Sequence, residues 1–217
     1  PATGKPFGAP AAVLRVDKIN GSVTVRVAGY QGNLPPAEQS GGFGERVQVQ
    51  GIGTERSECD EGFGRTISSA RSSAEVDRMG ESGVRFVFDV SAQGGHYRTS
   101  SIGSCIGNRP LGNEPHDTQS SAEANLEAQM DFTAGSKPVE FLWRNMAGAR
   151  LDVVGVTAAD TASGDAGFGV NLSGEGSHTF NLSPGIRYQA VIRHRSVAEA
   201  AGASLQRITG DGQVTLR

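Results

Sequence analysis

The stretch SSAEANLEAQMDFTA, residues 120–134, decides the fold class of this 217-residue chain. Its alanine and glutamate content would allow a helix. However, apolar residues recur at every second position, with polar residues between them: Ala122, Ala124, Leu126, Ala128, Met130 and Phe132. Because successive side chains of a strand point to opposite faces of its sheet, this period of two predicts a half-buried β-strand.

The same alternation extends outward from this stretch in both directions. GVRFVFDVSA (83–92) is the clearest further strand, and RTISSARSSAEVDR (65–78) also reads as a strand. After residue 138 a run of short alternating segments reaches the end of the sequence. SVAEAAG (196–202) is the exception, because its alanines and glutamate suit a short helical turn.

Turn and loop signals separate these strands. Asn20-Gly21, between two alternating runs, predicts a hairpin, because both central residues of a type I′ turn need a positive φ. Ser183-Pro184-Gly185 predicts a second turn. Residues 31–44 and the long polar segment 93–119 read as loops.

Together these patterns predict an all-β protein: an antiparallel β-sandwich, jelly-roll-like, of about eleven strands. The 31 glycines fit many short strands and turns better than long helices. Residues 13–217 would form one sandwich domain. Residues 1–12, rich in proline and glycine, would form an extended N-terminal arm.

Composition excludes two classes of partner. The net charge of −3 argues against nucleic acid, whose binding usually needs a basic stripe. No run of about 18 apolar residues occurs that would predict a membrane span. The sequence opens on Pro1 instead of Met, which suits either a removed signal peptide or a trimmed chain.

Two cysteines, Cys59 and Cys105, predict a disulfide and an oxidising compartment, so that the protein would be secreted or displayed at the cell surface. The bridge would tether the loop at 93–119 to the sandwich. Two free thiols in a reducing compartment are the alternative.

No residue set has a catalytic signature, so the sequence predicts no enzyme. The consecutive His96, Tyr97 and Arg98 form a candidate binding site, since such groups can hold or deprotonate an acidic sugar. Asp160 and Asp165 are the best candidate calcium ligands, and no other cofactor is expected.

For the other candidate residues we expect a structural role. We expect Phe141 and Trp143 to pack in the core. His178 and His194 are expected on a polar face, where Arg193, His194 and Arg195 would form a small basic patch.

The C-terminal half carries a family resemblance. Residues 66–90 and 118–217 resemble exported bacterial β-sandwich proteins of the PEP-CTERM type. The resemblance lies in the Ser/Ala-rich alternating strand, in the closing strand ASLQRITGDGQVTLR, and in the following hairpin residues: Phe180, Leu182, Pro184, Gly185 and Tyr188. It implies export and a surface or matrix role, and no catalytic residues. The Pro-Glu-Pro sorting tail of such proteins does not occur in this sequence.

Two functions follow as expectations. The first is a non-enzymatic structural or adhesive protein of the bacterial surface or matrix, which would self-associate into a filament when residues 1–12 add a strand to a neighbour's sheet. The alternative is a carbohydrate-binding module or polysaccharide lyase of jelly-roll type, whose partner would be a cell-surface glycan.

Overall fold

The computed structural model describes residues 13–29, 34–59, 62–99, 119–146, 151–158, 165–166, 170–172, 174–202 and 204–217. These residues form thirteen strands and no helix, so they contain no helix able to span a membrane. The strands are β1 (Arg15–Gly29), β2 (Ala37–Gly42), β3 (Val47–Cys59), β4 (Gly62–Met79), β5 (Gly83–Thr99), β6 (Gln119–Thr133), β7 (Val139–Met146), β8 (Leu151–Ala158), β9 (Asp165–Ala166), β10 (Val170–Leu172), β11 (Glu175–Phe180), β12 (Arg187–Ala201) and β13 (Leu205–Leu216).

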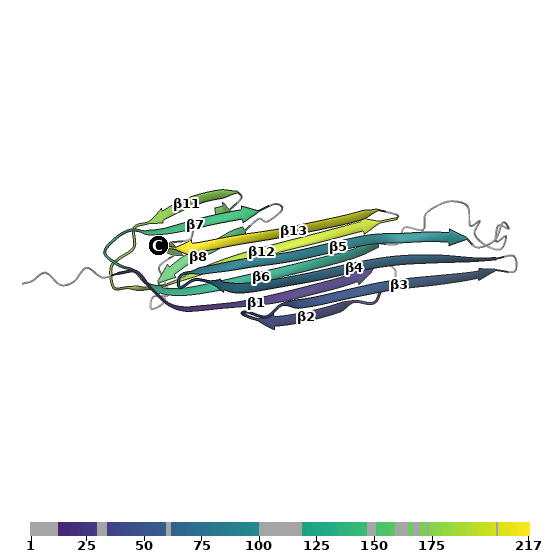
Figure 1. Cartoon of the computed structure of the whole chain (residues 1–217), viewed down its shortest axis with the longest axis horizontal. Coiled ribbons are helices and arrows are strands. Elements are labelled where there is room, and N and C mark those ends of the chain that lie inside the picture. Colours follow the sequence, from purple (N-terminus) through teal and green to yellow (C-terminus); the bar gives the residue numbers. More distant parts are fainter. Residues whose placement is uncertain are drawn as a thin grey trace, which may run out of the picture.

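The strands form two antiparallel sheets that pack face to face along the long axis of the molecule (Figure 1). Sheet A has the order β10-β8-β12-β6-β1-β2, with β9 beside β8, and sheet B has the order β11-β7-β13-β5-β4-β3. Most connections pass from one sheet to the other. The predicted antiparallel β-sandwich is therefore confirmed, with somewhat more strands than expected.

Three strands of sheet B continue past the end of the sandwich (Figure 1). Strand β13 pairs with β5 only as far as Gln93, and beyond that point β5 pairs with β4 alone. We call the extension the ribbon; it consists of residues 54–59 of β3, 62–67 of β4 and 96–99 of β5. The ribbon lies at the end of the molecule opposite the start of β1.

The half of the sandwich interior near the start of β1 is filled by large side chains. Phe141 and Phe180 meet edge to face with ring centroids 5.2 Å apart, and Phe132 stacks on Tyr188 at 5.9 Å. Phe86 is completely buried beside them in the same core. We call this region the aromatic half.

The half near the ribbon is rich in buried alanine, serine and glycine, with Val27 and Leu34 among them, and we call it the small-residue half. Its buried small side chains come from both sheets: Ser68, Ala70, Ser72, Ala92, Ser120, Ala122, Ala124, Ser196, Ala198 and Ala200. The hydroxyl of Ser72 donates to the backbone oxygen of Glu123 in the opposite sheet at 2.6 Å. The hydroxyl of Ser120 donates to the backbone oxygen of Gln93 at 2.6 Å, again between sheets. Side chains this short can bridge the layers only where the two backbones approach far more closely than the usual 10 Å.

Three predicted strands and one predicted turn are confirmed. Residues 65–78 lie within β4, 83–92 within β5, and 120–133 within β6. At the predicted turn Gly185 has a φ of +78°, and its backbone nitrogen donates to the backbone oxygen of Ala134 at 2.8 Å. This turn connects β11 of sheet B to β12 of sheet A, so the residues assigned to a hairpin form a crossover instead.

The hairpin predicted at Asn20-Gly21 is wrong, because both residues lie inside β1 and pair with β6. A Cβ on Gly21 would stand 2.9 Å from Cγ1 of Val76 and 2.7 Å from the backbone oxygen of Glu127. Glycine is therefore needed here for close packing within a strand, not for a turn.

Two predicted loops and one predicted helical turn also differ from the structure. The loop expected at 31–44 contains strand β2, and the loop expected at 93–119 starts later because residues 93–99 belong to β5. Residues 1–12 and 100–118 lie outside the described part. The helical turn expected at 196–202 is wrong: β12 continues to Ala201, since Ser196, Ala198 and Ala200 alternate into the core.

Candidate functional site

The structure describes only one of the two cysteines of the predicted disulfide. Cys59 is the last residue of β3 and pairs with Gly62 at the tip of the ribbon. Cys105 lies outside the described residues, so the pairing of the two cysteines remains a prediction.

The predicted binding and calcium residues are described only in part, so both sites remain predictions. His96, Tyr97 and Arg98 lie consecutively in β5. Asp165 lies in β9, and Asp160 is outside the described residues. Among the described residues there is no group of three or more histidine, cysteine or acidic side chains able to hold a metal ion.

The prediction that His194 faces a polar surface is wrong. His194 is 4% exposed, and its ring stacks on Phe88 across the sandwich with centroids 4.3 Å apart. Arg193 and Arg195 project to the opposite, outer face, so the expected three-residue basic patch does not exist. His178 is half-buried against Phe180, with ring centroids 4.7 Å apart.

Phe141 and Trp143 pack as the sequence suggests. Phe141 is buried, and Trp143 is half-buried against the same core. Gly176 stands opposite Trp143 on β11, and a Cβ there would lie 2.3 Å from Cζ2 of the indole. The glycine therefore makes room for the indole on the neighbouring strand.

The free edge of β3 is the longest unpaired sheet edge among the described strands. Strand β3 has 13 residues and pairs with β4 only. The edge strands β2 and β11 have six residues each, and β10 has three. An edge strand offers unpaired N–H and C=O groups to any further strand that approaches it.

The first half of this edge carries none of the features that usually prevent strand addition. Its sequence, VQVQGIG (47–53), contains no charged residue and no proline. Its register with β4 runs without a bulge from Val47 to Cys59. Natural sheets commonly protect such edges with lysine, proline or a bulge.

A row of four residues with an exposed apolar side chain at each end crosses the outer face of sheet B where the ribbon emerges. Ile52, Ser69, Gln93 and Leu205 are in register on β3, β4, β5 and β13. Ile52 is 69% exposed and Leu205 is 68% exposed, although both are large apolar side chains. The row thus ends at the free edge in an exposed isoleucine.

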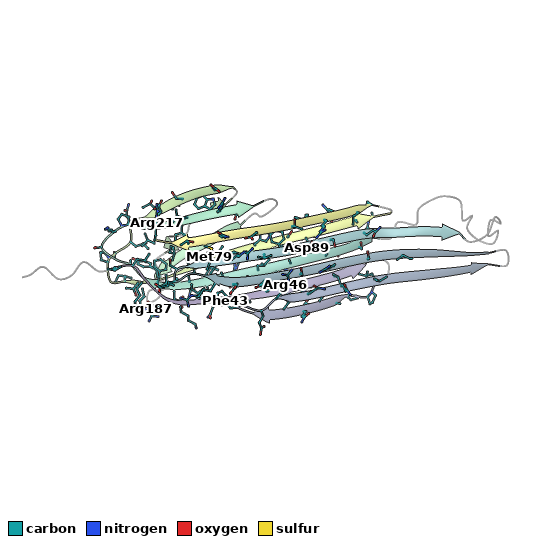
Figure 2. All side chains as sticks on the ribbon, viewed as in Figure 1. Phe43, Arg46, Met79, Asp89, Arg187 and Arg217 are labelled. Atoms are coloured by element: carbon teal, nitrogen blue, oxygen red, sulfur yellow. The ribbon has the colours of Figure 1, made fainter. Side chains whose placement is uncertain are left out.

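The remaining outer surfaces carry cross-strand ion pairs. On sheet A the pairs are Arg26–Glu38 at 2.5 Å, Arg193–Glu127 at 2.5 Å and Arg195–Glu123 at 2.9 Å. On sheet B they are Arg207–Asp89 at 2.8 Å, Arg217–Glu140 at 2.8 Å and Arg85–Asp211. Figure 2 shows Asp89 along the middle of the molecule and Arg187 and Arg217 at the end away from the ribbon. Opposite charges on neighbouring strands support the register of each sheet.

Some members of these pairs have a pKa that is shifted in the direction that favours the charged form. The hydrogen bonds to Asp211 and Asp89 raise the pKa of Arg85 and of Arg207. Partial burial opposes ionisation of Glu123, but hydrogen bonds from Asn125 and Arg195 lower its pKa overall. These shifts keep Arg85, Arg207 and Glu123 ionised at neutral pH.

A shallow hollow of about 400 Å³ lies on the outer face of sheet A. Its walls include Ser22 and Thr24 of β1, Asn125 of β6, and Arg193 and Arg195 of β12. The hollow offers hydroxyl, amide and guanidinium groups, of which the two guanidiniums already bind Glu127 and Glu123.

The sequence did not reveal the free edge of β3 or the row from Ile52 to Leu205. The uncharged run 47–53 was recognisable as a strand, but its place at a sheet edge depends on the topology. The row joins four strands that are distant in sequence, so no local pattern could have revealed it.

Comparison of the chain with protein-family models, with curated proteins and with solved structures finds no match.

Proposed function

We propose that the chain is a non-enzymatic structural or adhesive module of a cell surface or extracellular matrix, which self-associates by strand addition. The free edge of β3 is the observation that carries this proposal. A 13-residue edge with an uncharged first half is a template for another strand, and its exposure is a liability unless a partner covers it.

The test is the assembly state of the purified chain, measured by light scattering and by electron microscopy. We expect ordered oligomers or filaments whose amount increases with protein concentration. Deletion of residues 1–12 should leave a monomer with the same circular dichroism spectrum. A full-length chain that stays monomeric at every concentration would refute self-association.

We also propose a disulfide between Cys59 and Cys105 at the ribbon, as expected for an exported protein. Ser57, Gly64 and Thr99 are in register on the three ribbon strands, which places the ends of β3 and β5 two strand spacings apart, about 10 Å. Cys105 follows Thr99 by six residues, a length of chain that can reach about 20 Å.

Alkylation under non-reducing conditions followed by intact-mass measurement tests the bridge. The bridged protein gains no alkyl group until it is reduced. Two groups added before reduction would favour the free thiols of a reducing compartment.

Glycan binding is the second candidate function, and the hollow on sheet A favours it. Hydroxyl, amide and guanidinium groups can bind the hydroxyls and carboxylates of an acidic sugar. A glycan array tests binding, with Arg195→Gln as the variant expected to lose it. Release of an unsaturated, ultraviolet-absorbing product from a uronate polymer would instead indicate lyase activity.

A further inference from the structure

We propose that the acceptor for residues 1–12 is the free edge of β3 in a second copy of the chain, so that copies join head to tail. This inference rests on the proposed self-association and specifies its surface and geometry. The donor segment is taken from one copy and the acceptor edge from the next.

The acceptor edge is open along most of its length. Val47 packs beside Gly41 of β2, where a Cβ on that glycine would lie 2.4 Å from Cγ1 of Val47. Beyond Val47 no described strand pairs with β3 on this side. The open part therefore includes Gln48, Gln50 and Ile52 and continues along the ribbon.

An added strand would also cover an exposed apolar side chain. Ile52 is 69% exposed and lies on the edge strand itself. Side chains directly opposite each other on paired strands have Cβ atoms about 5 Å apart. The new strand would therefore remove much of the Ile52 surface from water, in addition to satisfying the backbone groups of the edge.

The donor sequence PATGKPFGAPAA has its internal prolines in a pattern that suits pairing on one side. Pro6 and Pro10 are four residues apart, so their nitrogens, which lack a hydrogen, lie on the same edge of an extended strand. In the added strand, the N–H groups of Thr3, Lys5, Phe7 and Ala9 would point to the other edge. A strand of this kind can pair fully along one edge while its prolines face solvent, as edge prolines do.

The start of β1, which the donor segment precedes in sequence, and the open edge of β3 lie toward opposite ends of the sandwich. Strand β1 starts at Arg15, opposite Thr133 of β6, whose other neighbour is Arg187. Arg187 marks the end away from the ribbon (Figure 2), whereas the open edge of β3 extends into the ribbon (Figure 1). A donor at one end and an acceptor at the other make a heterologous contact, which generates a chain of copies instead of a closed dimer.

The lengths of the two segments also correspond. Twelve extended residues span about 40 Å, and the 13 residues of β3 span a similar distance. When copies are aligned in the same direction, the donor runs along β3 in parallel and continues directly into β1 of its own copy.

A mixing experiment tests the inference with two variants. The first lacks residues 1–12 and keeps the acceptor. The second, Gln48→Lys with Gln50→Lys, keeps the donor and places two charges on the exposed edge strand. We expect each variant alone to be monomeric and a mixture to form a one-to-one heterodimer by light scattering.

The control places the same two charges on a central strand. Thr209→Lys with Gln213→Lys changes the outer face of β13, which pairs with β5 at both positions and also with β7 at Gln213. This control should assemble like the unmodified chain. If the edge variant assembles as well as the control, β3 is not the acceptor, although self-association would stand.

A peptide measurement tests the pairing itself. A synthetic peptide of residues 1–13 is added to the chain that lacks residues 1–12, and backbone hydrogen exchange is followed. We expect slower exchange in residues 47–59 and no change in β11. Slower exchange in β11 or in β2 instead would assign the donor to another edge and overturn the inference.

The matched control peptide exchanges Ala9 and Pro10 and keeps the composition. The exchange moves one proline nitrogen to the pairing edge, where it removes one donor. Loss of one net hydrogen bond corresponds to about fivefold weaker binding. Equal binding of the two peptides would show that the peptide does not bind as a paired strand.

Discussion

The aromatic half and the small-residue half of the sandwich belong to the same strands but are held together differently. In the aromatic half, Phe86, Phe132 and Phe141 fill a wide space between the sheets. In the small-residue half, the sheets are close enough for Ser72 to bond directly to the backbone of the opposite layer. The difference shows that side-chain volume, read along a single strand, sets the local thickness of a sandwich.

The two halves should therefore fail under opposite kinds of substitution. Removal of volume leaves a cavity in the aromatic half, whereas addition of volume forces the backbones apart in the small-residue half.

Phe86→Ala should destabilise the protein by about 3–5 kcal/mol, because it removes a fully buried ring from the aromatic half. Equilibrium unfolding in urea measures the loss of free energy. Val87→Ala, on the outer face of the same strand, is the control and should cost far less. Equal losses at both positions would mean that the aromatic half is not a packed core.

Gly94→Ala should destabilise the protein by about 1–3 kcal/mol, because a Cβ would lie 1.9 Å from the backbone oxygen of Gly202. Gly51→Ala is the control in the same half, since its Cβ would be in ordinary contact, 3.4 Å from Leu34. The thermal midpoints of the two variants give the comparison. A fully tolerated Gly94→Ala would contradict the close approach of the layers.

Ser72→Ala should cost about 0.5–1.5 kcal/mol, the usual net contribution of one hydrogen bond. Urea unfolding measures this loss as well. Ser69→Ala, on the outer face of the same strand, should be nearly neutral. If the two serines prove equivalent, the bond from Ser72 to the opposite sheet contributes nothing to the joining of the layers.

The outer ion pairs should not distinguish the halves. The pKa of Glu140 is lowered mainly by the hydrogen bond from Arg217, and that of Glu123 is lowered despite partial burial. A carboxyl whose pKa is lowered by folding stabilises the fold above its unfolded pKa of about 4.5, and this contribution is lost as the pH falls through the folded pKa.

When the pH falls below about 4.5, the free energy of unfolding should therefore decrease less in Arg195→Gln and in Arg217→Gln than in the unmodified protein. The difference should be small and similar for the two variants. Surface pairs of this kind contribute little to stability because solvent screens them. Urea titrations at pH 3 and pH 7 measure the difference. A much larger effect of Arg195→Gln would show that ion pairs, too, differ between the halves.

The sequence predicted strands well where apolar and polar residues alternate over a long run. Residues 120–134 are an example: their helix propensity was overruled by a period of two, and β6 has this pattern of burial. The same reasoning failed for SVAEAAG, because alanine is ambiguous between helix and a closely packed strand. It failed for Asn20-Gly21 because a glycine can also admit a neighbouring side chain, here Val76.

The candidate site was much less predictable than the fold. His194 was predicted to share a polar face with Arg193 and Arg195, but in a strand those neighbours point to the opposite face. The free edge of β3 follows from which strands pair, and pairing is a long-range property. The sequence could indicate that strand addition was available, but not at which edge.

The alignment of every long strand with the axis of the molecule has a mechanical consequence. The bonds between neighbouring strands are perpendicular to the strands themselves. A pull applied between the start of β1 and the tip of the ribbon would therefore load many of these bonds at once, in shear, instead of opening them one after another. In a chain of copies joined end to end, each sandwich would resist tension as a whole.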